Sequence, residues 1–323
     1  MHGGDPRRFD LTSIGESMLR LSVGPGQRWE SASDASLGVG GAESNVCAAL
    51  AGLGRPVSWS SAVPDNTLGR HLLRQLRACG VDIGGVHRPS AGRLGVYFVQ
   101  LADQPADVRV TYDRAGSVAS RLSAADVDWD RLLNTRVLHL TGITPALSDS
   151  CRELTQEAIC RAKAIGVTVS FDINLRSRLW SENPAGVLLP LIRDVDILIC
   201  KKDDAEQLLG VEADATGVLE ALKTRTAAST VVLTLGFEGA IALEGSTVLK
   251  QNAFPTVVRD RLGAGDAFAA GLLDGWLDGS LAQGLLRGCA LAALALSQRG
   301  DILITTRGEL DRIAVGHPAT VDR

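Results

Sequence analysis

The chain has 323 residues, of which 45% are hydrophobic and 22% are charged, and its formal net charge is −4. This apolar share is large enough for a full hydrophobic core, which excludes general disorder. The acidic balance and the 4% of aromatic residues argue against a nucleic-acid-binding protein, which is normally basic and supplies stacking side chains. By its length, the chain forms either two domains or one large α/β domain.

The N-terminus and the cysteines predict a cytoplasmic protein. The first ten residues, MHGGDPRRFD, lack the apolar core of a signal peptide, and we expect residues 1–8 to form a disordered tail. The longest apolar runs are far shorter than the ~20 residues that span a bilayer. The six cysteines include no CxxC pair and no histidine at metal-ligand spacing, so we expect reduced and mostly buried thiols.

In chain order, the first predicted elements are a strand, an exposed β segment and a helix. Phe9–Ile14 predicts a short strand. Residues 17–39 alternate apolar and polar positions and carry glycines, which is typical of exposed β structure. After GGAESN (40–45), the apolar residues of VCAALAGLG share one helical face, and Gly54 ends the predicted helix.

A strand at 57–62 and a helix near 68–79 follow. Residues 92–114 then predict a β-hairpin, because GVYFVQ and VRVTYDR are separated by the polar turn 102–107. We expect this hairpin and the exposed β segment to form a small lid. The strand at 95–100 is expected to have an exposed edge that pairs with a second copy of the chain in a dimer.

From about residue 124, strand-like and helix-like segments alternate, which specifies a parallel sheet with helices on both faces. The predicted strands are 137–140, 167–172, 195–199 and 231–235, and the predicted helices lie near 149–165, 184–192, 204–209 and 215–226. A hairpin over 240–251 and helices near 265–278 and 281–298 complete the chain. We therefore predict one α/β domain over residues 9–323, with a discontinuous β lid from about 17–39 and 90–114.

The strongest chemical signal is the turn Gly263-Ala264-Gly265, which opens a predicted helix. Free backbone N–H groups and the positive end of the helix dipole suit a phosphate or a developing oxyanion. Asp266 lies in the first helical turn, where the dipole is expected to keep it ionised and weakly basic. An ordinary helix start with an acidic residue explains this segment equally well. It is neither a Walker loop nor a GxGxxG fingerprint, which disfavours a dinucleotide oxidoreductase.

Three further segments carry weaker signals. In GGAESN, paired glycines let the backbone approach a ligand, and Asn45 either binds a hydroxyl or caps the helix. FDINLRSRLW (171–180) ends a predicted parallel strand, where ligands bind in open α/β sheets. There Asp172, Asn174 and Arg176 alternate, and Arg176 suits a carboxylate or phosphate unless it is simply solvent-exposed. TLGFEG (234–239) is compatible with an ordinary turn after a strand.

In this order, the segments resemble the PfkB (ribokinase-like) family of carbohydrate kinases over roughly residues 9–305. GGAESNVCAALAGLG resembles the family's N-terminal signature, and DRLGAGDAFAAG resembles its more specific C-terminal signature. The resemblance implies a ribokinase-like three-layer α/β/α sandwich with a mostly parallel central sheet and a small β lid that closes over the sugar.

The resemblance also implies roles for individual residues. Asp266 matches the base that takes the proton of the attacking hydroxyl, and the backbone of Gly263, Ala264 and Gly265 matches the anion hole for the transferred phosphoryl. Positions that contact the nucleotide in the family are matched by Thr234, Gly236, Gly239, Gly263 and Gly265. Positions that contact the sugar are matched by Gly40, Gly41 and Asn45.

Two positions are linked by the resemblance to metal ions. Glu206 matches the last residue of the NxxE motif, which is associated with Mg²⁺ and phosphate, and Asp260 matches an acidic position that helps to hold a monovalent cation such as K⁺. Asp203 stands in place of the usual Asn of NxxE, and Arg261-Leu262 replace a hydroxylic pair. The arrangement of the metal and the potassium dependence are therefore open questions.

Within the family, GESMLRL (15–21), YDRAGSVAS (112–120) and DINLRSRLW look most like 2-keto-3-deoxygluconate kinases, although the last segment is shared with fructokinases. This likeness implies Tyr97, Arg114 and Arg176 near an acidic sugar, with Arg176 on its carboxylate, since a buried carboxylate needs a cationic partner. The expected reactants are Mg·ATP and the terminal hydroxyl of a sugar or sugar acid. The expected partner is a second copy of the chain, not a nucleic acid or membrane. The alternatives are a fructokinase or other neutral-sugar kinase, and a non-catalytic sugar-binding relative.

Overall fold

The structure is a computed structural model, and it describes residues 7–101, 108–180 and 183–316. Most of the predicted tail, the predicted hairpin turn at 102–107 and residues 317–323 lie outside the described residues. The large sheet is built from β1 (Phe9–Ile14), β4 (Val57–Ala62), β5 (Val86–His87), β8 (Thr135–Thr141), β9 (Thr168–Asp172), β10 (Ile197–Lys201), β11 (Thr230–Thr234), β12 (Ala240–Glu244) and β13 (Thr247–Gln251).

The nine strands lie in the order β13-β12-β11-β10-β9-β8-β1-β4-β5. All pairs from β11 through to β5 are parallel, and only β12 and β13 run antiparallel to their neighbours. The predicted parallel sheet is therefore confirmed. Its consequence for function is that β9, β10 and β11 end side by side at one edge, where open α/β sheets bind their ligands.

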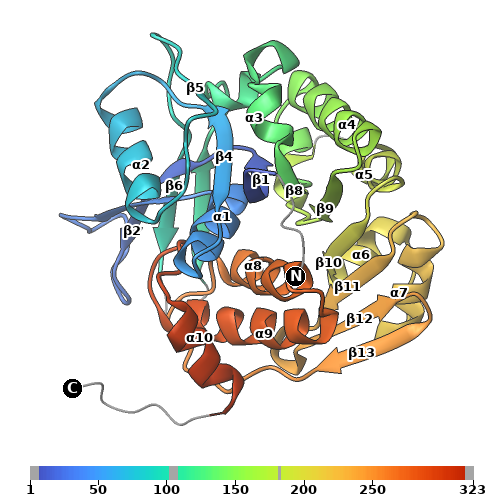
Figure 1. The fold of residues 1–323 in the computed structure, drawn as a ribbon. Coiled ribbons are helices and arrows are strands. Elements are labelled where there is room, and N and C mark those ends of the chain that lie inside the picture. Colours follow the sequence, from blue (N-terminus) through green and yellow to red (C-terminus); the bar gives the residue numbers. More distant parts are fainter. Residues whose placement is uncertain (1–6, 102–107, 181–182, 317–323) are drawn as a thin grey trace.

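The helices are α1 (Ala42–Gly52), α2 (Thr67–Ala78), α3 (Trp129–Leu133), α4 (Asp149–Ala164), α5 (Ala185–Ile192), α6 (Lys202–Leu209), α7 (Ala215–Lys223), α8 (Ala264–Leu277), α9 (Leu281–Ser297) and α10 (Arg307–Ala314). They cover both faces of the sheet (Figure 1). Ile199 and Val232 belong to the core beneath α1, α8 and α9, whereas Leu198 and Val231 belong to the core beneath α4 to α7. Neighbouring strand residues thus face opposite helical layers, which explains why these strands are continuously apolar.

A second sheet, in the order β3-β2-β6-β7, contains β2 (Met18–Val23), β3 (Ser36–Gly40), β6 (Val96–Gln100) and β7 (Arg109–Asp113). It joins the two segments that were expected to form the lid, and we call this four-stranded sheet the lid sheet, or lid. The expected exposed edge at 95–100 is wrong, because β6 pairs with β2 on one side and with β7 on the other. The parallel β2–β6 pairing joins distant parts of the chain, so no local pattern in the sequence reveals it.

Some short elements were not predicted. α3 and α10 are capped by the side chains of Asp128 and Thr306, which accept hydrogen bonds from backbone N–H groups of the first turn. β5 has two residues. β5 and α3, with two and five residues, are too short for a hydrophobic period to develop in the sequence.

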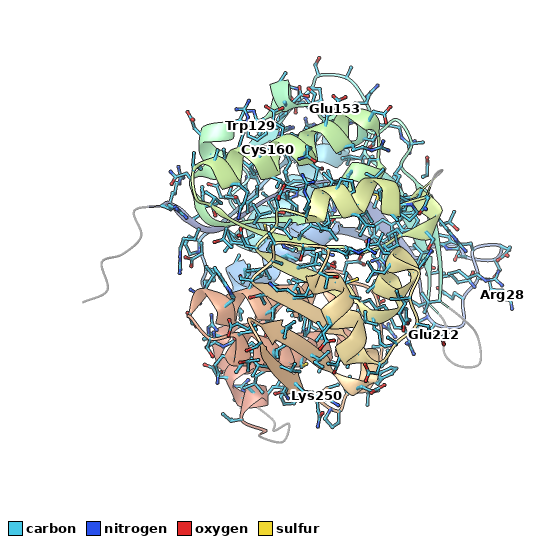
Figure 2. All side chains as sticks on the ribbon, turned by 90° about the vertical axis from the view of Figure 1, so that its right-hand side faces the viewer. Arg28, Trp129, Glu153, Cys160, Glu212 and Lys250 are labelled. Atoms are coloured by element: carbon cyan, nitrogen blue, oxygen red, sulfur yellow. The ribbon has the colours of Figure 1, made fainter. Side chains whose placement is uncertain are left out.

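The sequence predicts mostly buried thiols and no membrane-spanning segment, and the structure gives the exposure of the cysteines and the lengths of the helices. Cys47, Cys151, Cys200 and Cys289 are buried, and Cys160 is exposed. In Figure 2, Cys160 lies near Trp129 on the outer layer of helices. Within the part of the chain that the structure describes, no helix has the length and apolarity needed to cross a bilayer.

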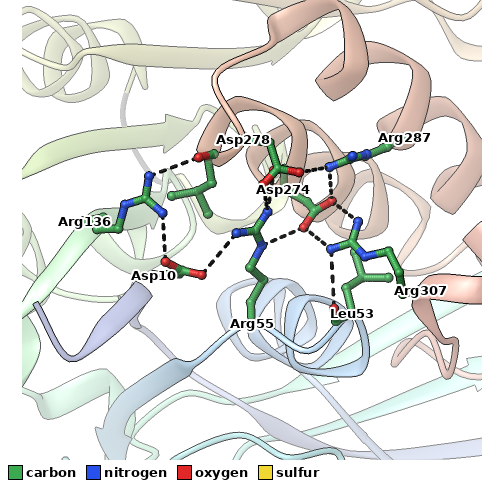
Figure 3. Close-up of polar contacts among 9 residues, drawn as sticks. Asp10, Leu53, Arg55, Arg136, Asp274, Asp278, Arg287 and Arg307 are labelled. Atoms are coloured by element: carbon green, nitrogen blue, oxygen red, sulfur yellow. Dashed lines mark hydrogen bonds and ion pairs between the residues drawn. The ribbon is translucent and has the colours of Figure 1, made fainter. Parts of the chain in front are cut away.

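A buried ionic network ties the helical layer of α8 together (Figure 3). Asp274 of α8 is fully buried, and its carboxylate accepts hydrogen bonds from Arg55, Arg287 and Arg307 at 2.5–2.8 Å. Burial alone would raise the pKa of Asp274, but the guanidinium groups hold it below its usual value. One carboxylate thereby connects α8 with the α1–β4 loop, α9 and α10.

Replacing Asp274 with Ala should lower the free energy of unfolding by about 3 kcal/mol, because three partly buried guanidinium groups lose the buried carboxylate that they share. Urea unfolding followed by circular dichroism measures this loss. The matched control is Glu157→Ala, which breaks an exposed ion pair with Arg161 and should cost less than about 1 kcal/mol. Equal losses in the two variants would contradict the assigned importance of the network.

Candidate functional site

A cavity of about 1040 Å³ lies between the lid sheet and the carboxyl ends of β9, β10 and β11. It brings together all the residues predicted for catalysis, the sugar and the nucleotide. These cavity-lining residues are Gly40, Gly41, Asn45, Tyr97, Arg114, Arg176, Thr234, Gly236, Gly239, Gly263, Ala264, Gly265 and Asp266. Segments that are far apart in the sequence therefore form one continuous surface.

The turn before α8 has a backbone that only glycine adopts readily. Gly263 is the N-cap residue of α8 and has φ 82°, in the left-handed region. A Cβ atom at this position would lie 2.2 Å from the carbonyl oxygen of Asp301. Both the conformation and the close contact require glycine here. Gly263, Ala264 and Gly265 line the cavity, and the N–H groups that a helix start leaves free suit an anion.

Asp266 lies one residue beyond this turn and is buried at the cavity wall. Asn45 Nδ2 donates a hydrogen bond of 2.7 Å to Asp266 Oδ2. Burial raises the pKa of Asp266 to about 6, although the Asn45 hydrogen bond and the charge of Arg176 act in the opposite direction. The prediction of a weakly basic carboxylate is thus wrong, because desolvation outweighs the helix N-terminus.

Asn45 makes a hydrogen bond at the start of its helix, as one of its two interpretations expects, and the binding of a hydroxyl stays a prediction. Asn45 lies inside α1, and its Oδ1 accepts a hydrogen bond of 3.3 Å from the N-cap N–H of Gly41. Its amide nitrogen meanwhile holds Asp266. The side chain therefore fixes the start of α1 and, across the cavity wall, the start of α8.

The segment after β9 turns sharply into the cavity. Asn174 has φ 38°, which is unusual for a residue other than glycine, and its N–H donates to Asp172 Oδ1 at 3.1 Å. Burial and the nearby charge of Asp266 raise the pKa of Asp172 to about 8. As predicted, Asp172, Asn174 and Arg176 all line one crevice.

Two cavity arginines differ in their charge compensation. Arg114 is nearly buried and donates to Glu16 Oε2 at 2.7 Å through Nε and 2.5 Å through Nη2. Arg176 is exposed and makes no side-chain hydrogen bond or ion pair with any residue that the structure describes. The Arg176 guanidinium is consequently available to an anion in the cavity.

The lid contributes two tyrosine rings to the cavity, and the backbone of one lid strand packs closely against polar side chains at Gly40. Tyr97 stacks on Tyr112 with ring centroids 5.8 Å apart. A Cβ atom at Gly40 would lie 2.4 Å from the Tyr97 hydroxyl and 2.9 Å from Asp301 Oδ2. Glycine is therefore required at position 40 for the lid strand to meet these polar groups.

Several cavity residues were missed in the sequence. Glu16 lies in the segment GESMLRL, which does not show that Arg114 would be its partner, and Asp301 follows α9 as an isolated acidic residue. Asp204 precedes the predicted Glu206 by two residues and lines the cavity, whereas Glu206 does not. The apolar wall on the side of Thr234 consists of Phe254, Pro255, Cys289, Ala292, Ala293 and Leu296.

The two residues predicted to bind metal ions do not line the cavity. Glu206 accepts a hydrogen bond of 2.5 Å from Lys202 Nζ. Asp260 is fully buried and is held by the guanidinium of Arg20 at 2.5 Å. Among the described residues, no group of three or more His, Cys, Asp and Glu side chains is placed to hold a metal ion.

Replacing Asn45 with Leu should raise the pKa of Asp266 above about 6, because the hydrogen bond that stabilises the carboxylate is lost. A ¹³C NMR titration of the aspartate carboxyl groups, assigned with Asp266→Asn, measures this value. Asn66→Ala, which removes a cap of α2, should leave it unchanged. An unchanged or lower pKa in Asn45→Leu would contradict the geometry.

Comparison with known proteins gives a consistent picture. The family model described as pfkB family carbohydrate kinase matches residues 9–307. The chain is 35% identical to 2-dehydro-3-deoxygalactonokinase of Haloferax volcanii over 97% of its length and 99% of that protein, and 33% identical to 2-dehydro-3-deoxygluconokinase of Bacillus subtilis over 91% and 92%. The solved structure of 2-dehydro-3-deoxygluconokinase from Thermotoga maritima superposes with a TM-score of 0.90 at 30% identity, covering 96% of this chain and 99% of that one.

Proposed function

The chain belongs to the pfkB family of carbohydrate kinases, and we propose that it uses ATP to phosphorylate the terminal hydroxyl of 2-keto-3-deoxygluconate or a closely related sugar acid. The predicted ribokinase-like three-layer fold and the predicted kinase class are confirmed by this membership and by the superposition. The choice of a sugar acid depends on one observation above all: the guanidinium of Arg176 lines the cavity and has no hydrogen-bond or ion-pair partner among the described residues.

A carboxylate that leaves water for an enclosed cavity needs a fixed cationic partner. Arg114 is neutralised by Glu16, so Arg176 is the arginine that we assign to the sugar carboxylate. Tyr97 and Arg114 then surround the sugar from the lid, together with Gly40, Gly41 and Asn45. The relatives from Haloferax volcanii and Bacillus subtilis are named as kinases of 2-dehydro-3-deoxy sugar acids, which supports this class of substrate.

For the transfer step, we assign Asp266 as the base. Its carboxylate accepts the proton of the attacking hydroxyl while the hydroxyl oxygen forms a bond to the γ-phosphorus and ADP leaves in line. A pKa of about 6 leaves the group ionised at neutral pH and still basic enough for proton transfer. The N–H groups of Gly263, Ala264 and Gly265 stabilise the charge on the transferred phosphoryl oxygens.

The nucleotide is assigned to the side of the cavity formed by Thr234, Gly236 and Gly239, where the apolar wall around Phe254 suits the base. Mg²⁺ bound with ATP would neutralise the phosphate oxygens. Asp204 and Asp172 line the cavity and would hold it, Asp172 after release of its proton, because Mg²⁺ commonly takes one or two carboxylates together with phosphates. Glu206 would act only through its neighbours, since Lys202 holds its carboxylate.

Two alternatives remain distinct from this proposal. A kinase for fructose or another neutral sugar would share DINLRSRLW, the segment of Arg176, but would not need its guanidinium to bind a carboxylate. A non-catalytic sugar-binding protein would have no use for a base at Asp266. The assembly of two copies into a dimer and a cytoplasmic location stay predictions.

Replacing Asp266 with Asn should reduce kcat by about 10²- to 10⁴-fold, because the proton acceptor is removed. The affinity for ATP should stay close to that of the wild type. A coupled assay of ADP release and a titration with ATP by calorimetry measure the two quantities. Near-normal turnover in the folded variant would exclude Asp266 as the base.

Replacing Arg176 with Ala should raise KM for a keto-deoxy sugar acid by about 10-fold or more, because a hydrogen bond between two charged groups is lost. KM for fructose, a neutral sugar, should change little in the same variant. Arg193→Ala removes an exposed arginine that pairs with Asp194 and serves as the control. Equal losses on both sugars would favour the neutral-sugar kinase.

A further inference from the structure

Arg20 is a buried cation in the lid that is not among the residues lining the cavity. It lies in the middle of β2, opposite Gly38 of β3 and Tyr97 of β6. Its side chain is only 3% exposed. A charge that is this well removed from water must be paired, and its partners show what it holds in place.

The guanidinium of Arg20 binds two carboxylates from different parts of the chain. Nη2 donates to Asp260 Oδ2 at 2.5 Å, and Nη1 donates to Asp301 Oδ1. Asp260 lies in the loop before α8, and Asp301 lies in the loop after α9. One lid side chain thereby joins both segments that enclose the anion-binding turn.

Each carboxylate is connected to that turn through the backbone. Asp260 Oδ1 accepts from Leu262 N–H at 3.1 Å, and its Oδ2 accepts from Gly300 N–H at 3.2 Å. The carbonyl oxygen of Asp301 packs against Gly263 so closely that a Cβ atom would lie 2.2 Å from it. A displacement of either carboxylate would therefore displace Gly263 and the N–H groups that follow it.

The negative charges of Asp260 and Asp301 require a cation between the two carboxylates. Burial and the charge of Asp260 favour the protonated form of Asp301 and raise its pKa, whereas Arg20 acts in the opposite direction. Without Arg20, two neighbouring buried carboxylates would repel one another. One of them would then take up a proton or an external cation, and the backbone contacts with the turn would change.

We infer that Arg20 is a positioning residue, an internal cation that the lid supplies to hold the anion-binding turn at Gly263–Gly265 in its active geometry. The inference rests on the proposed role of this turn in phosphoryl transfer. It also has a consequence for Asp260: because a guanidinium already neutralises this carboxylate, turnover should not depend on K⁺.

The test compares Arg20→Ala with Arg93→Ala. Arg93 is another arginine of the lid region with a carboxylate partner, Asp113, but its side chain is 42% exposed. We expect Arg20→Ala to lower kcat by about 100-fold, the loss that a misplaced group of this kind causes, and Arg93→Ala to leave it unchanged. Millimolar guanidinium chloride, far below denaturing concentrations, should restore part of kcat in Arg20→Ala only, because the ion refills the space between Asp260 and Asp301.

Circular dichroism establishes whether Arg20→Ala is folded. A folded variant with kcat within about threefold of the wild type, or a loss that guanidinium does not relieve at all, would overturn the inference. If the variant does not fold, the salt dependence of kcat in the wild type tests the inference by itself. Equal rates in potassium, sodium and tetramethylammonium salts support an internal cation, and an activation of about tenfold or more by potassium would overturn it.

The same measurements separate this inference from the proposed function. The ratio of kcat between Arg20→Ala and the wild type is taken on whichever sugar the wild type phosphorylates fastest. A wild type that prefers fructose contradicts the sugar-acid proposal, while the ratio still tests Arg20. A wild type that phosphorylates a sugar acid and an Arg20→Ala variant that does so equally well contradict only the role of Arg20.

Discussion

The hydrogen bond from Asn45 to Asp266, 2.7 Å long, joins the two glycine-rich segments on which the site depends. One segment begins α1 next to the lid, and the other begins α8 beneath the cavity. This bond holds together the starts of α1 and α8, to which we assign the sugar and the transferred phosphoryl. In-line phosphoryl transfer depends mainly on such positioning, because the protein itself has little covalent chemistry to perform.

The buried carboxylates fall into two groups according to whether an arginine compensates their charge. Asp274, Glu16 and Asp260 are each held by arginine. Asp266 and Asp172, in contrast, make no ion pair with any described residue, and burial raises the pKa of both. A carboxylate left without a cation at a cavity wall is poised to accept a proton or to meet a bound cation, which is where catalytic groups are expected.

Much of the fold could be predicted from the sequence, because parallel strands and amphipathic helices leave local patterns. The turn at Gly263 could be predicted for the same reason, since its chemistry lies in consecutive residues. Glu16, Arg20 and Asp301 could not, because their importance comes from partners brought together by the β2–β6 pairing and by the loop after α9. The basicity of Asp266 was misjudged because desolvation depends on the packed environment, and a sequence shows only the neighbouring helix N-terminus.

The most direct test of the account is a panel assay of ATP consumption by the wild type with keto-deoxy sugar acids, fructose and ribose, in which ³¹P NMR identifies the product. The account predicts the highest kcat/KM for a 2-keto-3-deoxy sugar acid, with the phosphate on its terminal oxygen. It also predicts a kcat/KM that falls below pH 6, as Asp266, with its pKa of about 6, takes up a proton. A preference for fructose or ribose, or no phosphorylated product from any of these sugars, would contradict it.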